Sequence, residues 1–96
     1  MYGTVARMRL KAGAEAALRA MTAGYRENPV PGQVATYAYR MDADPQEYYL
    51  AVVFASKEAY RANAQSPEQH ARFEQMLALL EGEPEWHDGE IIDAQG

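Results

Sequence analysis

The stretch Tyr48-Tyr49-Leu50-Ala51-Val52-Val53-Phe54-Ala55-Ser56-Lys57-Glu58-Ala59-Tyr60 decides the fold, because it passes from a strand directly into a helix. Residues 48–54 are apolar throughout, which is the pattern of a strand whose two faces are both covered. Ser56 is a favourable N-terminal cap for a short helix from Lys57 to about Ala64. The stretch therefore predicts a buried strand followed by a short helix.

The segments before this stretch supply two more strands and a helix. Residues 2–11 alternate as a strand does, and residues 14–26 repeat apolar side chains at helical spacing. Residues 28–32 (Asn-Pro-Val-Pro-Gly) end this helix and turn the chain, since each proline removes a hydrogen-bond donor. Residues 33–41 form a second strand rich in Val, Thr and Tyr, and residues 42–46 form the hairpin loop that leads into the apolar strand.

A second helix start and a last strand follow the short helix. Ser66 and Pro67 favour a helix start, because serine caps the first turn and proline fits the first helical position. We expect this helix to stop at Gly82, and residues 85–92 to form the last strand. The buried face of the helix is expected to hold His70, Phe73, Met76, Leu77 and Leu80.

The resulting order βαββαβ is that of the ferredoxin-like α+β fold. In this fold helices cover one face of a four-stranded antiparallel sheet, and we expect one such domain over residues 1–96. The strands at 33–41 and 48–54 nevertheless carry apolar side chains on both faces, so the uncovered face of the sheet needs a partner. We expect a homodimer in which two sheets pack face to face.

The composition of the 96-residue chain argues against several classes of protein. The chain has no cysteine, which leaves no basis for disulfides or thiolate metal sites. Its net charge of −5 argues against nucleic-acid binding, which favours a basic surface. No apolar run approaches the roughly 20 residues that span a bilayer, and the N-terminus lacks the pattern of a signal peptide. We therefore expect a soluble, cytoplasmic protein with no nucleic-acid partner and no membrane partner.

The charge is divided unevenly along the chain. Residues 1–40 carry six basic and two acidic side chains, whereas residues 41–96 carry three basic and twelve acidic ones. Either the C-terminal helices have solvated acidic faces, or the two halves are complementary and help two copies to associate. Charge alone does not choose between these two interpretations.

The chain resembles the antibiotic biosynthesis monooxygenase family in three stretches. Residues 5–13 (Val-Ala-Arg-Met-Arg-Leu-Lys-Ala-Gly) look like the first strand of that family, and residues 48–60 look like a later strand with its Ser-Lys/Arg-Glu-Ala-aromatic helix start. Ser66-Pro67 is similar to the start of the next helix. The resemblance implies a dimeric α+β barrel. The family includes cofactor-free oxygenases of quinol- or anthrone-type aromatics, haem-degrading members and proteins of unknown role.

The haem-degrading branch of this family has an asparagine on its first strand, a tryptophan on its short helix and a histidine on the next helix. This sequence has Ala6 and Asn63 at the first two positions. The histidine position falls near Arg72 or Phe73, and His70 lies two or three residues before it. All three positions differ, so the resemblance argues against haem degradation, although a histidine one turn away could still bind iron.

Two polar side chains are candidates for catalysis. The side chain of His70 ordinarily titrates close to neutral pH, which suits a general base, and the alternative is an imidazole at the edge of the core that bonds to the backbone. Asn63 is expected to face inward on the short helix, where an amide costs stability unless it is paired. It either orients a substrate oxygen or ties down a neighbouring strand.

Aromatic side chains are expected to line an apolar pocket between the helices and the sheet. If Arg7, Arg9 and Arg40 all point to one side of the sheet, Tyr37 and Tyr39 point to the helix side. Each aromatic also has a plainer interpretation, as a packing residue of a strand or as an anchor at a strand end or dimer seam. The other expected pocket residues are Tyr60, Phe73 and Trp86.

No metal site is expected. His87, Asp88 and Glu90 are metal-ligating residue types, but neighbours along a strand point to opposite faces. The chain also lacks a Ser-His-Asp spacing, a phosphate-binding glycine loop and a nucleotide fingerprint.

The residues and the resemblance together predict an oxidoreductase that inserts oxygen into a small aromatic substrate without a metal, flavin or other cofactor. His70 would act as the base, and Asn63 with a tyrosine would hold the oxyanion. The alternative, from another functional class, is a non-catalytic dimeric module that binds a small apolar ligand. Haem binding or degradation is the third hypothesis.

Overall fold

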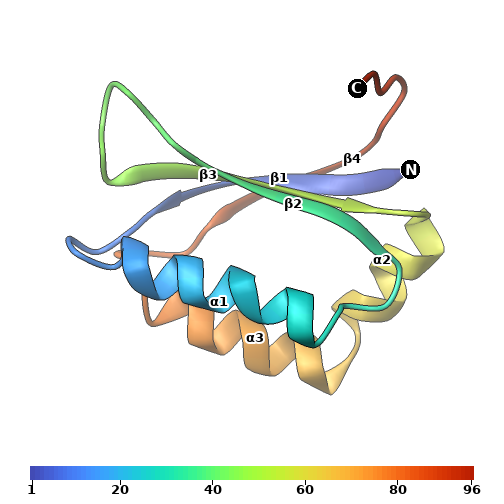
Figure 1. Ribbon diagram of the computed structural model, residues 1–96, viewed down its shortest axis with the longest axis horizontal. Helices are drawn as coiled ribbons and strands as arrows, with labels where there is room; N and C mark the ends of the chain where they lie inside the picture. Colours follow the sequence, from blue (N-terminus) through green and yellow to red (C-terminus); the bar gives the residue numbers. More distant parts are fainter.

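The computed structural model describes residues 1–96 and arranges them in two layers (Figure 1). One layer is a four-stranded antiparallel sheet, and the other holds three helices that lie on one side of it. The elements are β1 (Tyr2–Arg9), α1 (Glu15–Glu27), β2 (Gln33–Arg40), β3 (Glu47–Phe54), α2 (Lys57–Ala64), α3 (Pro67–Leu77) and β4 (Glu85–Glu90). The expected ferredoxin-like α+β fold is confirmed. No helix is long and apolar enough to cross a membrane.

The strands lie in the order β2-β3-β1-β4 across the sheet. The central strand β1 pairs with β3 on one side and with β4 on the other, and β2 and β3 form the expected hairpin. The register places Ala6 opposite both Leu50 and Trp86, and Thr4 opposite both Val52 and Asp88. Side chains of β1, β3 and β4 at these positions therefore share the face that the helices cover.

Serine side chains cap α2 and α3 as the sequence predicts. The Ser56 hydroxyl accepts a hydrogen bond from the Ala59 amide at 3.1 Å, and the Ser66 hydroxyl accepts one from the Gln69 amide at 3.1 Å. Ser66 also donates to the Asn63 carbonyl oxygen at 2.7 Å, so it joins the end of α2 to the start of α3. These bonds fix the corner between the two short helices.

The helix α3 ends earlier than the sequence indicates. It stops at Leu77 instead of continuing to Gly82, and the chain then pairs with the end of β1. Leu80 forms an isolated bridge with Leu10, and the Lys11 amide donates to the Leu79 carbonyl oxygen at 2.9 Å. Leu80 is buried by this pairing, as it would be on the inner face of a longer helix. The spacing of apolar residues alone therefore did not indicate where the helix ends.

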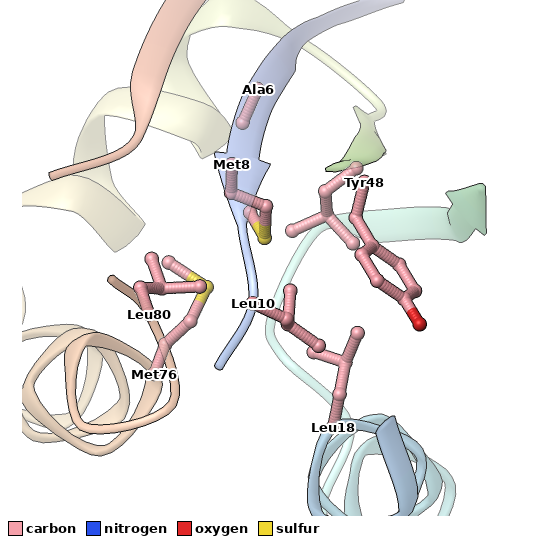
Figure 2. Packing of buried hydrophobic residues seen from close by; sticks show 8 residues of the cluster. Ala6, Met8, Leu10, Leu18, Tyr48, Met76 and Leu80 are labelled. Carbon is pink, nitrogen blue, oxygen red and sulfur yellow. The ribbon is translucent and has the colours of Figure 1, made fainter. Parts of the chain in front are cut away.

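The hydrophobic core lies between the sheet and the helices (Figure 2). Leu18 of α1 points toward Leu10 at the end of β1, and Met76 of α3 lies beside Leu80. Truncating a side chain such as Leu18, which is only 3% exposed, to alanine typically costs about 2–5 kcal/mol of stability. The other members of the cluster are Ala6, Met8, Tyr48 and Leu50.

Tyr37 and Tyr39 point away from the helices, so the expected orientation was wrong. They pair with Ala51 and Tyr49 of β3, on the face that carries no helix, and are 55% and 52% exposed. The expectation assumed that Arg40 points to the same side of the sheet as Arg7 and Arg9. The guanidinium of Arg40 instead binds Glu15 of α1 and therefore lies on the helix side. Alternation along β2 then places both tyrosines on the opposite face.

Candidate cavity between the helices and the sheet

A cavity of about 390 Å³ lies between the helices and the covered face of the sheet. Its volume falls within the range of roughly 300–1,000 Å³ typical of small-molecule sites, and most of its lining residues are hydrophobic. The structure brings five of the expected site residues to this cavity and leaves Tyr37 and Tyr39 outside it. The five are Tyr60, Asn63, His70, Phe73 and Trp86.

Packed aromatic rings form part of the cavity wall. Phe73 of α3 and Trp86 of β4 lie with ring centroids 6.1 Å apart. Tyr60 of α2 packs edge-on against Phe54 with ring centroids 5.4 Å apart, and its ring is tilted against that of Tyr2 at 5.2 Å. Such pairs are favourable contacts between large apolar side chains, so this part of the wall is suited to a flat apolar ligand. Trp86 thus lies on the helix side of β4, against Phe73.

A polar cluster joins α2 to α3 in the cavity wall. Asn63 donates from Nδ2 to Gln69 Oε1 at 3.1 Å, and its Oδ1 accepts from Arg72 Nη2 at 2.8 Å. Arg72 also donates from Nε to Gln69 Oε1 at 3.1 Å. Both acceptors of Arg72 are neutral amides, and no carboxylate pairs with it. The cluster therefore presents a positioned, half-buried cation whose charge no protein anion neutralises.

Asn63 therefore holds neighbouring side chains in place instead of tying down a strand. Sequence analysis did not single out Gln69 or Arg72 as site residues. A signal was present, because Gln69, Arg72, Phe73 and Met76 follow one another at the i, i+3, i+4, i+7 spacing of one helix face. A long cationic side chain on such a face was not recognised as a lining residue.

His70 lies at the rim of the cavity and not in the core. Its side chain is 74% exposed, and Nε2 lies 3.0 Å from Glu74 Oε1 one helical turn away. The expectation that α3 buries His70 was wrong, because the buried stripe of this helix begins at Gln69 and leaves His70 one position outside it. Its role as a base stays a prediction.

A second polar group lies where β1, β4 and α2 meet. The Tyr60 hydroxyl donates to Asp88 Oδ1 at 2.8 Å. Burial of the phenol and the adjacent Asp88 carboxylate raise the pKa of Tyr60 to about 12, so the phenol stays neutral at physiological pH. Thr4, which faces Asp88 across the β1–β4 pair, is 5% exposed, and its hydroxyl has no hydrogen-bond partner.

His87 is separated from this group by the alternation of β4. It pairs with Val5 on the open face of the sheet, and its Nε2 lies 2.8 Å from Glu85 Oε1. Asp88 points to the opposite face, as the sequence predicts for neighbours on a strand. No group of three or more histidine or acidic side chains is arranged to hold a metal ion.

The sequence model of one family, antibiotic biosynthesis monooxygenase, matches residues 1–75. The chain belongs to the antibiotic biosynthesis monooxygenase family. The resemblance noted in the sequence is thereby confirmed. The match ends within α3, so Trp86 and Asp88 in the cavity wall come from the part of the chain beyond it. No curated protein matches the chain in sequence.

Several solved structures share the fold of this chain. SnoaB from Streptomyces nogalater, described as a cofactor-independent oxygenase and solved with one asparagine mutated to alanine, is 19% identical with a TM-score of 0.78, over 97% of this chain and 94% of its own. An antibiotic biosynthesis monooxygenase-type protein from Chloroflexus aurantiacus is 22% identical with a TM-score of 0.76, over 99% and 96%. A Nitrosomonas europaea protein of unknown function is 23% identical with a TM-score of 0.73, over 98% and 91%.

Proposed function

We propose that this member of the monooxygenase family oxidises a small aromatic of the quinol or anthrone type in the cavity between helices and sheet, without a cofactor. One observation carries the proposal. The cavity combines an apolar, aromatic wall with Arg72, a cation held by neutral amides and free of any carboxylate partner. This combination suits a flat substrate that develops an oxyanion.

The chemistry requires little beyond binding and charge stabilisation. Loss of a proton converts an anthrone- or quinol-type substrate into an electron-rich anion, which reacts directly with dioxygen. One oxygen atom enters the product as a carbonyl, and the other leaves as water. Arg72 and Asn63 would stabilise the oxyanion before and during this step, because their positions are fixed by hydrogen bonds before the substrate binds.

The proton acceptor in this proposal is His70. Its imidazole lies at the cavity rim, where it can take a proton from the substrate and release it to solvent. Tyr25 and Tyr60 both line the cavity, but the proton of Tyr60 is directed to Asp88, and Arg72 is the group bonded directly to Asn63. Arg72 therefore takes the charge-stabilising role that the sequence had suggested for a tyrosine. SnoaB, which has the same fold and is described as a cofactor-independent oxygenase, supports the reaction class by analogy.

Oxygen uptake with a panel of hydroquinones and anthrones, without added cofactor, tests the proposal. We expect uptake by the native protein, and a loss of roughly 10- to 100-fold in Asn63→Ala and Arg72→Met, because each removes a group that stabilises developing charge. His70→Ala should lower the rate as well, because it removes the proposed proton acceptor. Arg61→Met is the matched control, since Arg61 is an exposed arginine on α2 that does not line the cavity.

A non-catalytic ligand-binding module is the second candidate, and the exposure of His70 favours it. A base that is 74% exposed is not shielded from solvent in the free protein. Binding of the same aromatics without any oxygen uptake above buffer would support this candidate against the enzyme. A Soret band that shifts on titration with haem would instead support the third hypothesis.

We also propose that two copies associate through the open face of the sheet. Val5, Tyr37 and Tyr39 on this face are 46%, 55% and 52% exposed, and they adjoin the apolar side chains of β3. An apolar surface of this kind on a sheet is typical of an interface. The arrangement leaves the cavity on the other side of each sheet.

A further inference from the structure

Two charged side chains of the cavity wall lack an ionic partner. Arg72 donates to amide oxygens only, and Asp88 accepts only from the Tyr60 hydroxyl. Asp88 is the only acidic residue in the cavity wall, so the wall holds no other carboxylate that could pair with Arg72. The wall thus carries one cationic and one anionic group, each with spare hydrogen-bonding capacity.

The position of Asp88 is fixed by the sheet and by Tyr60. It lies on the same face of β4 as Trp86, two residues away, and both line the cavity. The bond from Tyr60 occupies Oδ1, whereas Oδ2 of this solvent-exposed side chain has no partner within the protein. A carboxylate oxygen accepts hydrogen bonds and cannot donate them when ionised, so the free oxygen is suited to a ligand donor.

Thr4 lies at the same end of the cavity, with its side chain close to the Tyr60 hydroxyl. Its hydroxyl is buried without a hydrogen-bond partner and belongs to the residue directly opposite Asp88. No other buried side-chain nitrogen or oxygen of the chain lacks a hydrogen-bond partner. Polar atoms of this kind are uncommon in folded proteins, and a functional role is one of their explanations.

We propose that Asp88 determines ligand specificity by accepting a hydrogen bond from a ligand hydroxyl, so that the cavity prefers hydroxylated aromatics to the corresponding ethers. This inference rests on the proposed function in assuming that the ligand occupies the cavity. A hydroxyl donor gains a bond to a charged acceptor, whereas an ether loses that bond. A ligand carboxylate meets both the like charge of Asp88 and the opposite charge of Arg72, so Asp88 weakens an attraction that Arg72 would otherwise provide.

Binding measured without oxygen tests the inference independently of turnover. Isothermal titration calorimetry of the native protein under anaerobic conditions would compare 1-naphthol, 1-methoxynaphthalene and 1-naphthoate, which share one ring system. We expect 1-naphthol to bind about three- to thirtyfold more tightly than the ether, and the affinity of 1-naphthoate for the native protein serves as the reference for variants of Asp88. Equal affinity for the alcohol and the ether, or binding of neither, overturns the inference.

Variants of β4 assign the effect to Asp88. In Asp88→Asn we expect the preference for 1-naphthol over 1-methoxynaphthalene to fall severalfold and the affinity for 1-naphthoate to rise. Glu90→Gln is the matched control, because it removes an equal charge from the same face of β4 outside the cavity wall. An equal change in both variants, or none in Asp88→Asn, contradicts the assignment.

The two proposals can fail separately. Hydroxyl selectivity without oxygen uptake would leave Asp88 as a determinant of binding and would remove the oxygenase. Oxygen uptake without hydroxyl selectivity would retain the oxygenase and would remove the role of Asp88. The calorimetric comparison of three ligands on the native protein does not depend on the folding of any variant.

Discussion

Single residues give the cavity its polarity, because charged side chains are held there by neutral partners. Arg72 binds two amides and Asp88 binds a phenol, so both retain charge that a ligand can meet. Surface arginines such as Arg9 and Arg40 instead contact carboxylates, which neutralise the charge of each guanidinium. The difference lies in the partner and not in the residue type, which is why composition could not locate the site.

Tyr60 should ionise late in an alkaline titration. Its pKa is raised to about 12, first by burial and then by Asp88. Because the folded state disfavours the phenolate, the contribution of this group to stability is complete below about pH 10, its usual range. That contribution is lost as the pH rises toward 12. In a titration followed at 295 nm, the native spectrum minus that of Tyr60→Phe should show a midpoint near 12.

Tyr37→Phe serves as the control for this titration, because Tyr37 lies outside the cavity and the late component should persist without it. A Tyr60 midpoint close to the ordinary tyrosine value would contradict the contact with Asp88. Near-ultraviolet circular dichroism recorded in parallel shows whether the protein is still folded at each pH.

At the scale of elements, the corner between α2 and α3 positions Asn63 and Arg72. Ser66 caps α3 and at the same time bonds to the end of α2, while Gln69 in the first turns of α3 binds both Asn63 and Arg72. The cap signals in the sequence predicted where both helices begin. They did not predict where α3 ends, since that depends on pairing between Leu80 and the end of β1.

Ser66→Ala should destabilise the protein more than Ser56→Ala does. Each variant loses a cap bond, at a cost of about 1 kcal/mol. Ser66→Ala also loses the bond to the Asn63 carbonyl oxygen, worth roughly a further 0.5–1.5 kcal/mol. Urea denaturation at one fixed protein concentration measures both free energies of unfolding. Equal losses would show that the bond between the helices contributes nothing.

At the scale of the whole molecule, helices cover one face of the sheet and the other face remains open. The open face combines the exposed side chains Val5, Tyr37 and Tyr39 with the Arg7–Glu47 ion pair. The cavity opens on the opposite side, so association through the open face leaves the ligand site accessible. The two surfaces can therefore be altered independently by mutation.

Light scattering coupled to gel filtration should give the native protein about twice its chain mass of 10.7 kDa at micromolar concentration. Tyr37→Arg should shift it toward the single-chain mass, because a charge would be buried between the sheets. Ile92→Arg makes the same change at a side chain that is 94% exposed and lies beyond β4, and it should leave the mass unchanged. A native particle of 10.7 kDa would refute the association.

The sequence by itself determined the order of the elements, the caps of α2 and α3 and the hairpin between β2 and β3, because caps, prolines and periodicity act over a few residues. Only the tertiary structure decided which face of the sheet Tyr37 and Tyr39 occupy, since alternation states which side chains share a face but not which face meets the helices. It also decided that Arg72 and Asp88 line one cavity, because residues so far apart in the chain meet only through packing and strand register.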